Sequence, residues 1–98
     1  MLKFLILVHG DAKQPIPTEA WMPYLGTLKQ GNHLIGGSAV AGGWSITSTT
    51  TTTNVTDWLR GFHVIIATSV EEAKRLVATH PVVVAGGTVE LRELPATP

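Results

Sequence analysis

The stretch Met1-Leu-Lys-Phe-Leu-Ile-Leu-Val-His-Gly-Asp11 decides how the rest of the chain is read. Seven of its first nine residues are apolar, and the run stops at a Gly-Asp turn signal. A short aliphatic run with such an end is typical of a buried strand. Its even positions would face one side and its odd positions the other, and both sides are largely apolar. We therefore predict a strand covered on both faces, with His9 and Asp11 at its end.

Length and composition set limits on the class of protein. The 98 residues allow one domain, residues 1–98, and 44% of them are hydrophobic against 14% charged. Such a low charge fraction favours a second subunit that covers apolar surface. A monomer with an ordinary apolar surface is the alternative. The net charge is zero, which argues against a nucleic-acid partner. Cysteine is absent, so disulfides and thiolate chemistry are excluded.

No membrane or export segment is expected. The apolar run from Phe4 to Val8 is shorter than the ~7–15 residues of a secretory core, and no run reaches the ~18 of a membrane helix. We expect a soluble, cytoplasmic protein without a membrane partner.

Two helices are predicted. The first spans residues 18–30, with Thr18 as its N-cap and Gly31 just beyond its end, although Pro23 moves the regular part toward residue 22. The second begins at a capping box made by Ser69 and Glu72 and stops before Pro81. The apolar stripe of the first helix is Trp21, Leu25 and Leu28.

Extended segments fill most of the rest. We predict strands over residues 61–67 and 88–94, and a strand over 32–41 whose paired glycines indicate a bulge or a close backbone approach. The threonine-rich segment 44–53 favours a solvated strand, with a hydroxyl-lined phosphate or sugar site as the alternative. Residues 82–84 are predicted as a brief extended run.

The order strand, helix, strand, extended segment, strand, helix, strand is a duplicated split βαβ unit. It predicts an α+β, ferredoxin-like fold with a mainly antiparallel sheet and both helices on one face. The other face would then be bare, and its apolar residues favour a homodimer.

The chain resembles the YCII-related family, especially its DGPF branch. The resemblance is carried, in order, by the opening strand to Asp11, by Trp-Met-Pro-Tyr-Leu25, by Val-Thr-Asp57, by Gly-Phe-His-Val-Ile-Ile66, and by Gly-Thr-Val-Glu-Leu-Arg92. It covers nearly the whole chain and implies a dimeric α+β barrel, in which two ferredoxin-like sheets pack face to face. One branch of the family resembles enzymes that act on chlorinated hydroquinones.

Two departures from the family pattern bear on function. The Asp-Gly-Pro-Phe signature is absent, because Trp58 follows Asp57 where its glycine would stand. Some relatives have a proposed His–Asp pair with the histidine near the start of the first helix, where this chain has Trp21-Met22. Asp11 does match the acidic residue after the family's first strand.

His9 and Asp11 are the candidate catalytic residues. A turn at Gly10 could bring the carboxylate back to the imidazole, and a carboxylate that orients an imidazole is a common general base. The alternative is a strand-end histidine satisfied by backbone and an aspartate that forms the turn.

His63, Trp44 and Trp58 are candidate substrate-binding residues, although the histidine also suits a core position and the tryptophans suit loop anchors or a dimer contact.

The remaining polar candidates are interpreted as structural. His33 fits a solvated turn, His80 fits a helix end, and Glu90 with Arg92 fits cross-strand pairing. The histidines lack metal-binding spacing, and we expect no metal and no cofactor.

The leading hypothesis is a cofactor-independent acid/base enzyme that acts on a small aromatic or lactone-like molecule. A non-catalytic ligand-binding or structural dimer module is the competing hypothesis, and monooxygenase activity would follow only from fold analogy.

Overall fold

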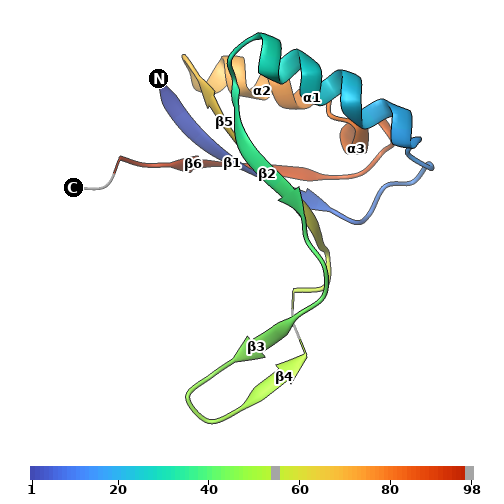
Figure 1. The fold of residues 1–98 in the computed structure, drawn as a ribbon, viewed down its shortest axis with the longest axis vertical. Coiled ribbons are helices and arrows are strands. Elements are labelled where there is room, and N and C mark those ends of the chain that lie inside the picture. Colours follow the sequence, from blue (N-terminus) through green and yellow to red (C-terminus); the bar gives the residue numbers. More distant parts are fainter. Residues whose placement is uncertain (54–55, 97–98) are drawn as a thin grey trace.

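The fold is an antiparallel sheet covered on one face by helices, as the computed structural model shows for residues 1–53 and 56–96 (Figure 1). The strand order is β2-β5-β1-β6, and each neighbouring pair is antiparallel. This is the order of a split βαβ duplication, so the predicted ferredoxin-like α+β fold is confirmed. The sheet strands are β1 (Leu2–His9), β2 (Leu34–Ala39), β5 (Leu59–Ala67) and β6 (Val89–Leu94).

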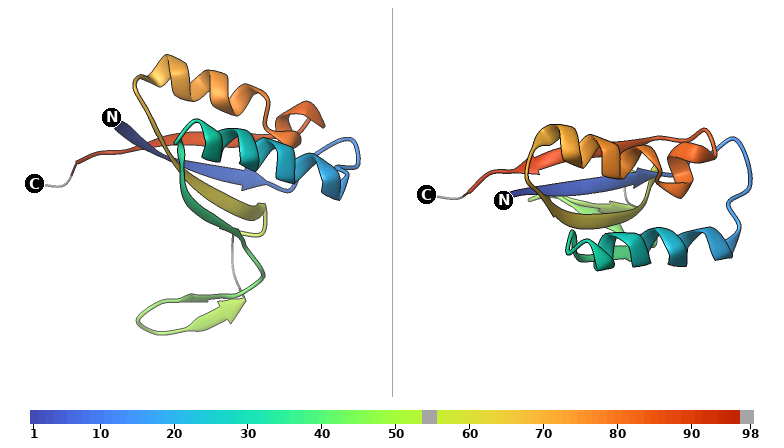
Figure 2. Two further views of the ribbon diagram at one scale, coloured as in Figure 1. Left: turned by 45° about the horizontal axis from the view of Figure 1, so that its top comes forward. Right: turned by 90° about the horizontal axis from the view of Figure 1, so that it is seen from above.

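The core lies between the sheet and the helices. The predicted alternation in β1 is confirmed, because Phe4, Ile6 and Val8 are buried while the odd positions between them are only half-buried. Strand β5 pairs with β1 over its whole length and alternates in the same way, with Ile65 and Ala67 fully buried. The helices α1 (Trp21–Gln30) and α2 (Val70–Ala78) run side by side over this face (Figure 2).

The start of α2 follows its predicted capping chemistry. The Ser69 hydroxyl accepts a hydrogen bond from the Glu72 amide at 3.1 Å. The Glu72 carboxylate reaches back to the Thr68 amide at 2.7 Å, one residue earlier than in an ideal capping box.

The regular part of α1 begins at Trp21, close to the residue 22 that Pro23 predicted, but its predicted N-cap is wrong. A short 3-10 turn, η1 (Thr18–Ala20), precedes α1. The N-cap of α1 is Ala20, which makes no side-chain hydrogen bond, so the prediction that Thr18 caps this helix is wrong. Pro23 therefore lies in the first turn, where its missing amide hydrogen costs no helical bond. At the other end the left-handed residue is Asn32, with φ of 60°, instead of Gly31.

Two further segments differ from their predicted form. The threonine-rich segment is a hairpin of β3 (Trp44–Ile46) and β4 (Thr51–Thr53), which projects from the body of the protein (Figure 1). Residues 82–84, predicted as extended, belong to the short helix α3 (Pro81–Val84). His80 caps this helix and Pro81 occupies its first position, and these local signals outweigh the β-propensity of the three valines.

Candidate functional site

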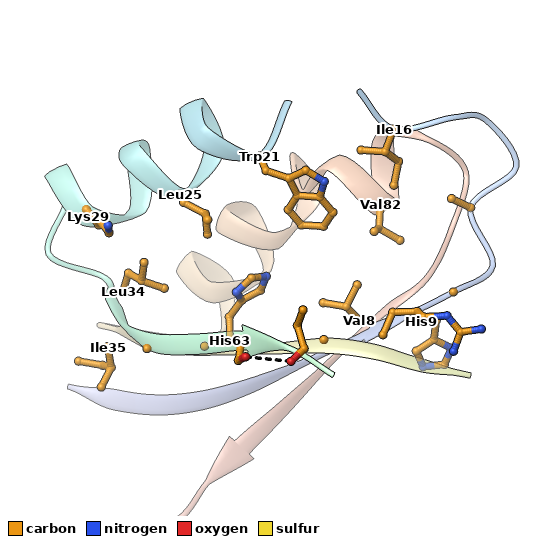
Figure 3. A pocket seen from close by; sticks show the side chains of 18 residues that line it. Val8, His9, Ile16, Trp21, Leu25, Lys29, Leu34, Ile35, His63 and Val82 are labelled. Atoms are coloured by element: carbon orange, nitrogen blue, oxygen red, sulfur yellow. Dashed lines mark hydrogen bonds between the residues drawn. The ribbon is translucent and has the colours of Figure 1, made fainter. Parts of the chain in front are cut away.

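A cavity of about 740 Å³ lies between α1 and the β2–β5 edge of the sheet (Figure 3). Its volume is that of a typical small-molecule site. One face of α1 lines it through Trp21, Leu25 and Lys29, which are four residues apart, while Tyr24 and Leu28 turn into the core. The predicted stripe of α1 is thus divided between core and cavity. The further apolar lining includes Val8, Ile16, Leu34 and Val82.

Gly37, the second of the paired glycines of β2, allows this strand to lie close against β5. The register of β2 on β5 shifts between Leu34 and Gly36, as the predicted irregularity requires. A Cβ atom on Gly37 would lie 2.5 Å from the carbonyl oxygen of Phe62 and 3.0 Å from Nδ1 of His63. A side chain at Gly37 would therefore displace the strand and crowd the imidazole.

Two histidines meet beneath the cavity. Nε2 of His63 lies 3.2 Å from Nε2 of His80, and the His80 ring is fully buried. The rings of Trp21 and Tyr24 pack edge-on against His80, with centroids 5.2 Å and 5.0 Å away. His63 lines the cavity, and its ring rises from the sheet toward Trp21 (Figure 3). The pair therefore connects the cavity to the core.

The hydrogen bonds of the pair determine its protonation pattern. Nδ1 of His80 accepts the amide hydrogen of Val82 at 3.1 Å, so a neutral His80 carries its proton on Nε2. That nitrogen donates to Nε2 of His63, which leaves the His63 proton on Nδ1. Nδ1 has no partner in residues 1–53 and 56–96, and no buried side-chain nitrogen there is unsatisfied, so Nδ1 is open to the cavity. His63 therefore presents an N–H donor to a ligand.

Both histidines are neutral at neutral pH. Burial lowers the pKa of His80 to about 4, and the neighbouring His63 adds to this effect. Burial also lowers the pKa of His63. A neutral imidazole with a fixed N–H can polarise a carbonyl or stabilise an oxyanion without itself becoming charged.

His9 lies at the margin of the same cavity, after a register shift between Val8 and His9. Its Nε2 atom is 2.8 Å from a carboxylate oxygen of Glu90 on β6, and its ring packs on Trp58 with centroids 4.3 Å apart. The other oxygen of Glu90 accepts hydrogen bonds from Arg92. The hydrogen bond from His9, and then that from Arg92, lowers the pKa of Glu90. The imidazole therefore has an ionised carboxylate beside it.

Asp11 makes other contacts than those predicted. Its two carboxylate oxygens accept hydrogen bonds from the amide and the hydroxyl of Thr88, at 2.8 Å and 2.7 Å. These bonds lower its pKa and hold the turn against the start of β6. Glu90, and not Asp11, contacts the His9 ring. The expected turn at Gly10 does form, but it directs Asp11 to Thr88.

The two candidate tryptophans lie outside the cavity lining. Trp44 is 75% exposed on the projecting hairpin, because β3 leaves the sheet before this residue is reached. Trp58 packs on the outer side of His9. Of the predicted site residues, His63 points into the cavity, whereas His9 borders it with its ring against Glu90, which lies opposite Leu7.

Neither a metal site nor a membrane span is visible in the described ranges. Residues 1–53 and 56–96 contain no group of three or more metal-ligating side chains. None of their helices is long and apolar enough to cross a membrane.

Comparison with known proteins identifies a solved structure with a similar fold. No protein-family model matches the sequence, and no curated protein matches it. The structure is similar to that of 5-chloro-2-hydroxyhydroquinone dehydrochlorinase (TftG) from Burkholderia phenoliruptrix AC1100, solved in complex with 2,5-dihydroxybenzoquinone. The TM-score is 0.61 at 16% sequence identity, and the match covers 99% of this chain and 96% of that chain. The chain has the fold of the dehydrochlorinase.

Three residues of the site were not predicted as functional. His80 was interpreted as structural, since nothing in the sequence connects it to His63, which lies 17 positions earlier. Glu90 was assigned to pairing within the sheet, and its bond to His9 spans 81 positions. Trp21 was assigned to the core side of α1. The local sequence marks His80 only as the residue before a proline that begins a helix, which does not indicate that its ring is buried.

Proposed function

We propose that this protein is a small enzyme that catalyses cofactor-independent proton transfer on a planar aromatic or quinonoid molecule bound in the cavity. The observation that carries the proposal is the open Nδ1–H of His63 in an apolar cavity. That donor would stabilise negative charge on a substrate oxygen. The fold of a dehydrochlorinase solved with 2,5-dihydroxybenzoquinone supports the same class of substrate for this chain.

In the proposed reaction, His9 acts as the base. Its ring takes a proton from a hydroxyl of the substrate or from the sp3 carbon beside a carbonyl in its keto tautomer, and Glu90 holds the ring and stabilises the imidazolium that forms. The electron pair left on the substrate is delocalised onto an oxygen that accepts the Nδ1–H bond of His63. His63 is unsuited to be the base itself. Its free lone pair is on Nε2, which already accepts the proton of His80, so a proton there would force the His80 proton onto Nδ1. His80 would then lose the hydrogen bond that its Nδ1 accepts from the Val82 amide.

A non-catalytic binding module is the second candidate. It is favoured by the position of His9, whose ring is already engaged by Glu90 and Trp58 at the cavity margin. Saturable binding without proton exchange would support this candidate over the enzyme.

Hydrogen–deuterium exchange tests the proposal. We expect the protein to accelerate exchange of the ring C–H protons of 2,5-dihydroxybenzoquinone with heavy water, measured by proton NMR. In this exchange a deuteron from the solvent adds to a ring carbon to give the keto tautomer, and His9 then removes the original proton from that sp3 carbon to restore the ring. Glu90→Gln should slow the catalysed exchange by about tenfold, since an orienting carboxylate supplies part of the gain from a general base. Asp11→Asn is the matched control and should stay within about twofold, because its carboxylate is bonded to Thr88. Equal losses in both variants would contradict the assignment of Glu90.

We also propose that the protein is a homodimer of the YCII-related type. The sheet face away from the helices carries a continuous set of half-buried apolar side chains. A second copy packed face to face would remove this surface from water. The set consists of Leu5, Leu7, Phe62, Val64 and Ile66.

Sedimentation tests the dimer. The wild type should sediment at twice the 10.4 kDa chain mass, and Val64→Glu should yield the monomer because it would bury a charge. Lys74→Glu, on the exposed side of α2, should leave the dimer intact. A wild-type particle of 10.4 kDa at every concentration would refute the dimer.

A further inference from the structure

The polar side chains around the cavity are mostly hydrogen-bond donors. His63 presents Nδ1–H, and the Trp21 indole N–H, Lys29 and Arg60 can only donate. The exceptions are Ser38, whose hydroxyl hydrogen is already given to the carbonyl of Ala39 at 2.8 Å, and His9 at the margin, whose second ring nitrogen accepts when the ring is neutral. A ligand that satisfies this lining must be rich in acceptors.

The charges of the lining have one sign. Lys29 and Arg60 line the cavity, and no aspartate or glutamate within residues 1–53 and 56–96 does so. The Arg60 guanidinium donates to the backbone carbonyls of Asp57 and Leu59, which leave its positive charge uncompensated. In that same part of the chain, the ion pairs are those of Glu90 with His9 and with Arg92. Within the described residues, the charged side chains that line the cavity are therefore both basic, which favours an anionic ligand.

The two cations lie at separate ends of the cavity. Lys29 lies at the end opposite His9 (Figure 3). Arg60 lies beside the residue after His9, since a Cβ atom on Gly10 would come within 2.8 Å of the Arg60 Cγ atom. The Nδ1–H of His63 lies on the floor between them. Hydrogen-bond donors are thus spread along the cavity. This arrangement suits a flat molecule that carries oxygen atoms on opposite edges.

We propose that the cavity selects its ligand as an anion, namely a planar aromatic or quinonoid molecule bearing a carboxylate or an ionised hydroxyl. Arg60 and Lys29 attract the negative charge, and His63 binds an oxygen of the ring. This inference rests on the proposed function in taking the cavity as the substrate site, and it adds the charge of the substrate.

A matched pair of test ligands isolates the charge. 4-Hydroxybenzoate and 4-hydroxybenzamide have nearly the same shape, and at pH 7 only the first is an anion. We expect calorimetric titration to give a Kd about tenfold lower for the anion, the size of one partly screened charge contact. Raising the salt concentration to about 1 M should weaken binding of the anion and leave the amide nearly unchanged.

Variants assign the preference to the two cations. Arg60→Gln and Lys29→Gln should each reduce the preference for the anion, and the double variant should abolish it while the Kd of the amide stays within about twofold. Arg60→Lys should retain most of the preference because it keeps the charge. Lys74→Gln, on the exposed side of α2, is the control and should change neither Kd. Circular dichroism melts would identify any variant that fails to fold.

The outcomes separate this inference from the proposed function. Equal affinity for both ligands, or a preference that survives in the double variant, would overturn the anion selection even if proton exchange is catalysed. Anion preference without catalysed exchange would uphold the selection and overturn the enzymatic reaction. If neither ligand binds, the anion selection is overturned, and the proposed reaction is then judged by the exchange experiment alone.

Discussion

Replacing His63 with alanine should slow the catalysed proton exchange about 100-fold, the usual cost of removing one donor to a developing oxyanion. The Nδ1–H bond strengthens as charge builds on the substrate oxygen, so most of the loss should appear in kcat and less in KM. His63→Ala also leaves the Nε2–H of buried His80 without its acceptor. Exchange kinetics at several ligand concentrations, measured by NMR, would separate the two parameters.

His63→Asn is the matched control for this prediction. Its amide nitrogen can take the place of Nδ1 and should recover part of kcat, which a purely structural role would not explain. If alanine and asparagine lose kcat equally, or if either retains wild-type kcat, His63 is not the oxyanion donor.

The second large expected effect is a loss of stability in mild acid. The unfolded chain binds the His80 proton near the ordinary pKa of 6.5, whereas the folded protein binds it only near 4. The unfolded state therefore holds more protons across this window, and the free energy of unfolding falls as the pH falls. We expect the His80 contribution to cost about 2 kcal/mol between pH 7 and pH 5. The lowered pKa of His63 acts in the same direction.

Urea denaturation at pH 7, 6 and 5 measures this effect. The window stays above the lowered pKa values of Asp11, Glu72 and Glu90, so these carboxylates remain ionised in it. His80→Asn can still cap α3 but cannot titrate, so it should be less stable at pH 7 and show a smaller pH dependence. A wild-type free energy of unfolding that is unchanged from pH 7 to pH 5 would contradict the predicted neutrality of His80.

The main strands and α2 could be predicted because their signals are local. Alternating apolar residues in β1 and β5 identify the faces of these strands, and Ser69 with Glu72 marks the start of α2. The errors arose where one local signal competed with another. Three valines suggested a strand at residues 82–84, but His80 and Pro81 cap a helical turn. Thr18 suggested an N-cap, but a 3-10 turn delays the helix.

The candidate site could be predicted only in part. His9 and His63 were recognisable because both are histidines that interrupt apolar strands. The partners of these histidines were not recognisable. Asp11 was expected to contact His9 because it is close in the sequence, whereas the residue that does contact His9, Glu90, is distant in the sequence. Register decides this pairing: β6 lies antiparallel to β1, with Glu90 opposite Leu7, so its carboxylate reaches His9 across the strands.

The sequence by itself determined the alternation of β1, the order of the elements and hence the split βαβ fold, since these depend on side chains within a few residues of each other. Only the tertiary structure decided that His63 meets His80, that Glu90 instead of Asp11 meets His9, and that α1 stands off β2 to leave a cavity. Those contacts join elements far apart in the chain, and their geometry depends on strand register and helix packing. The fold was therefore readable from local pattern, whereas the chemistry of the site was not.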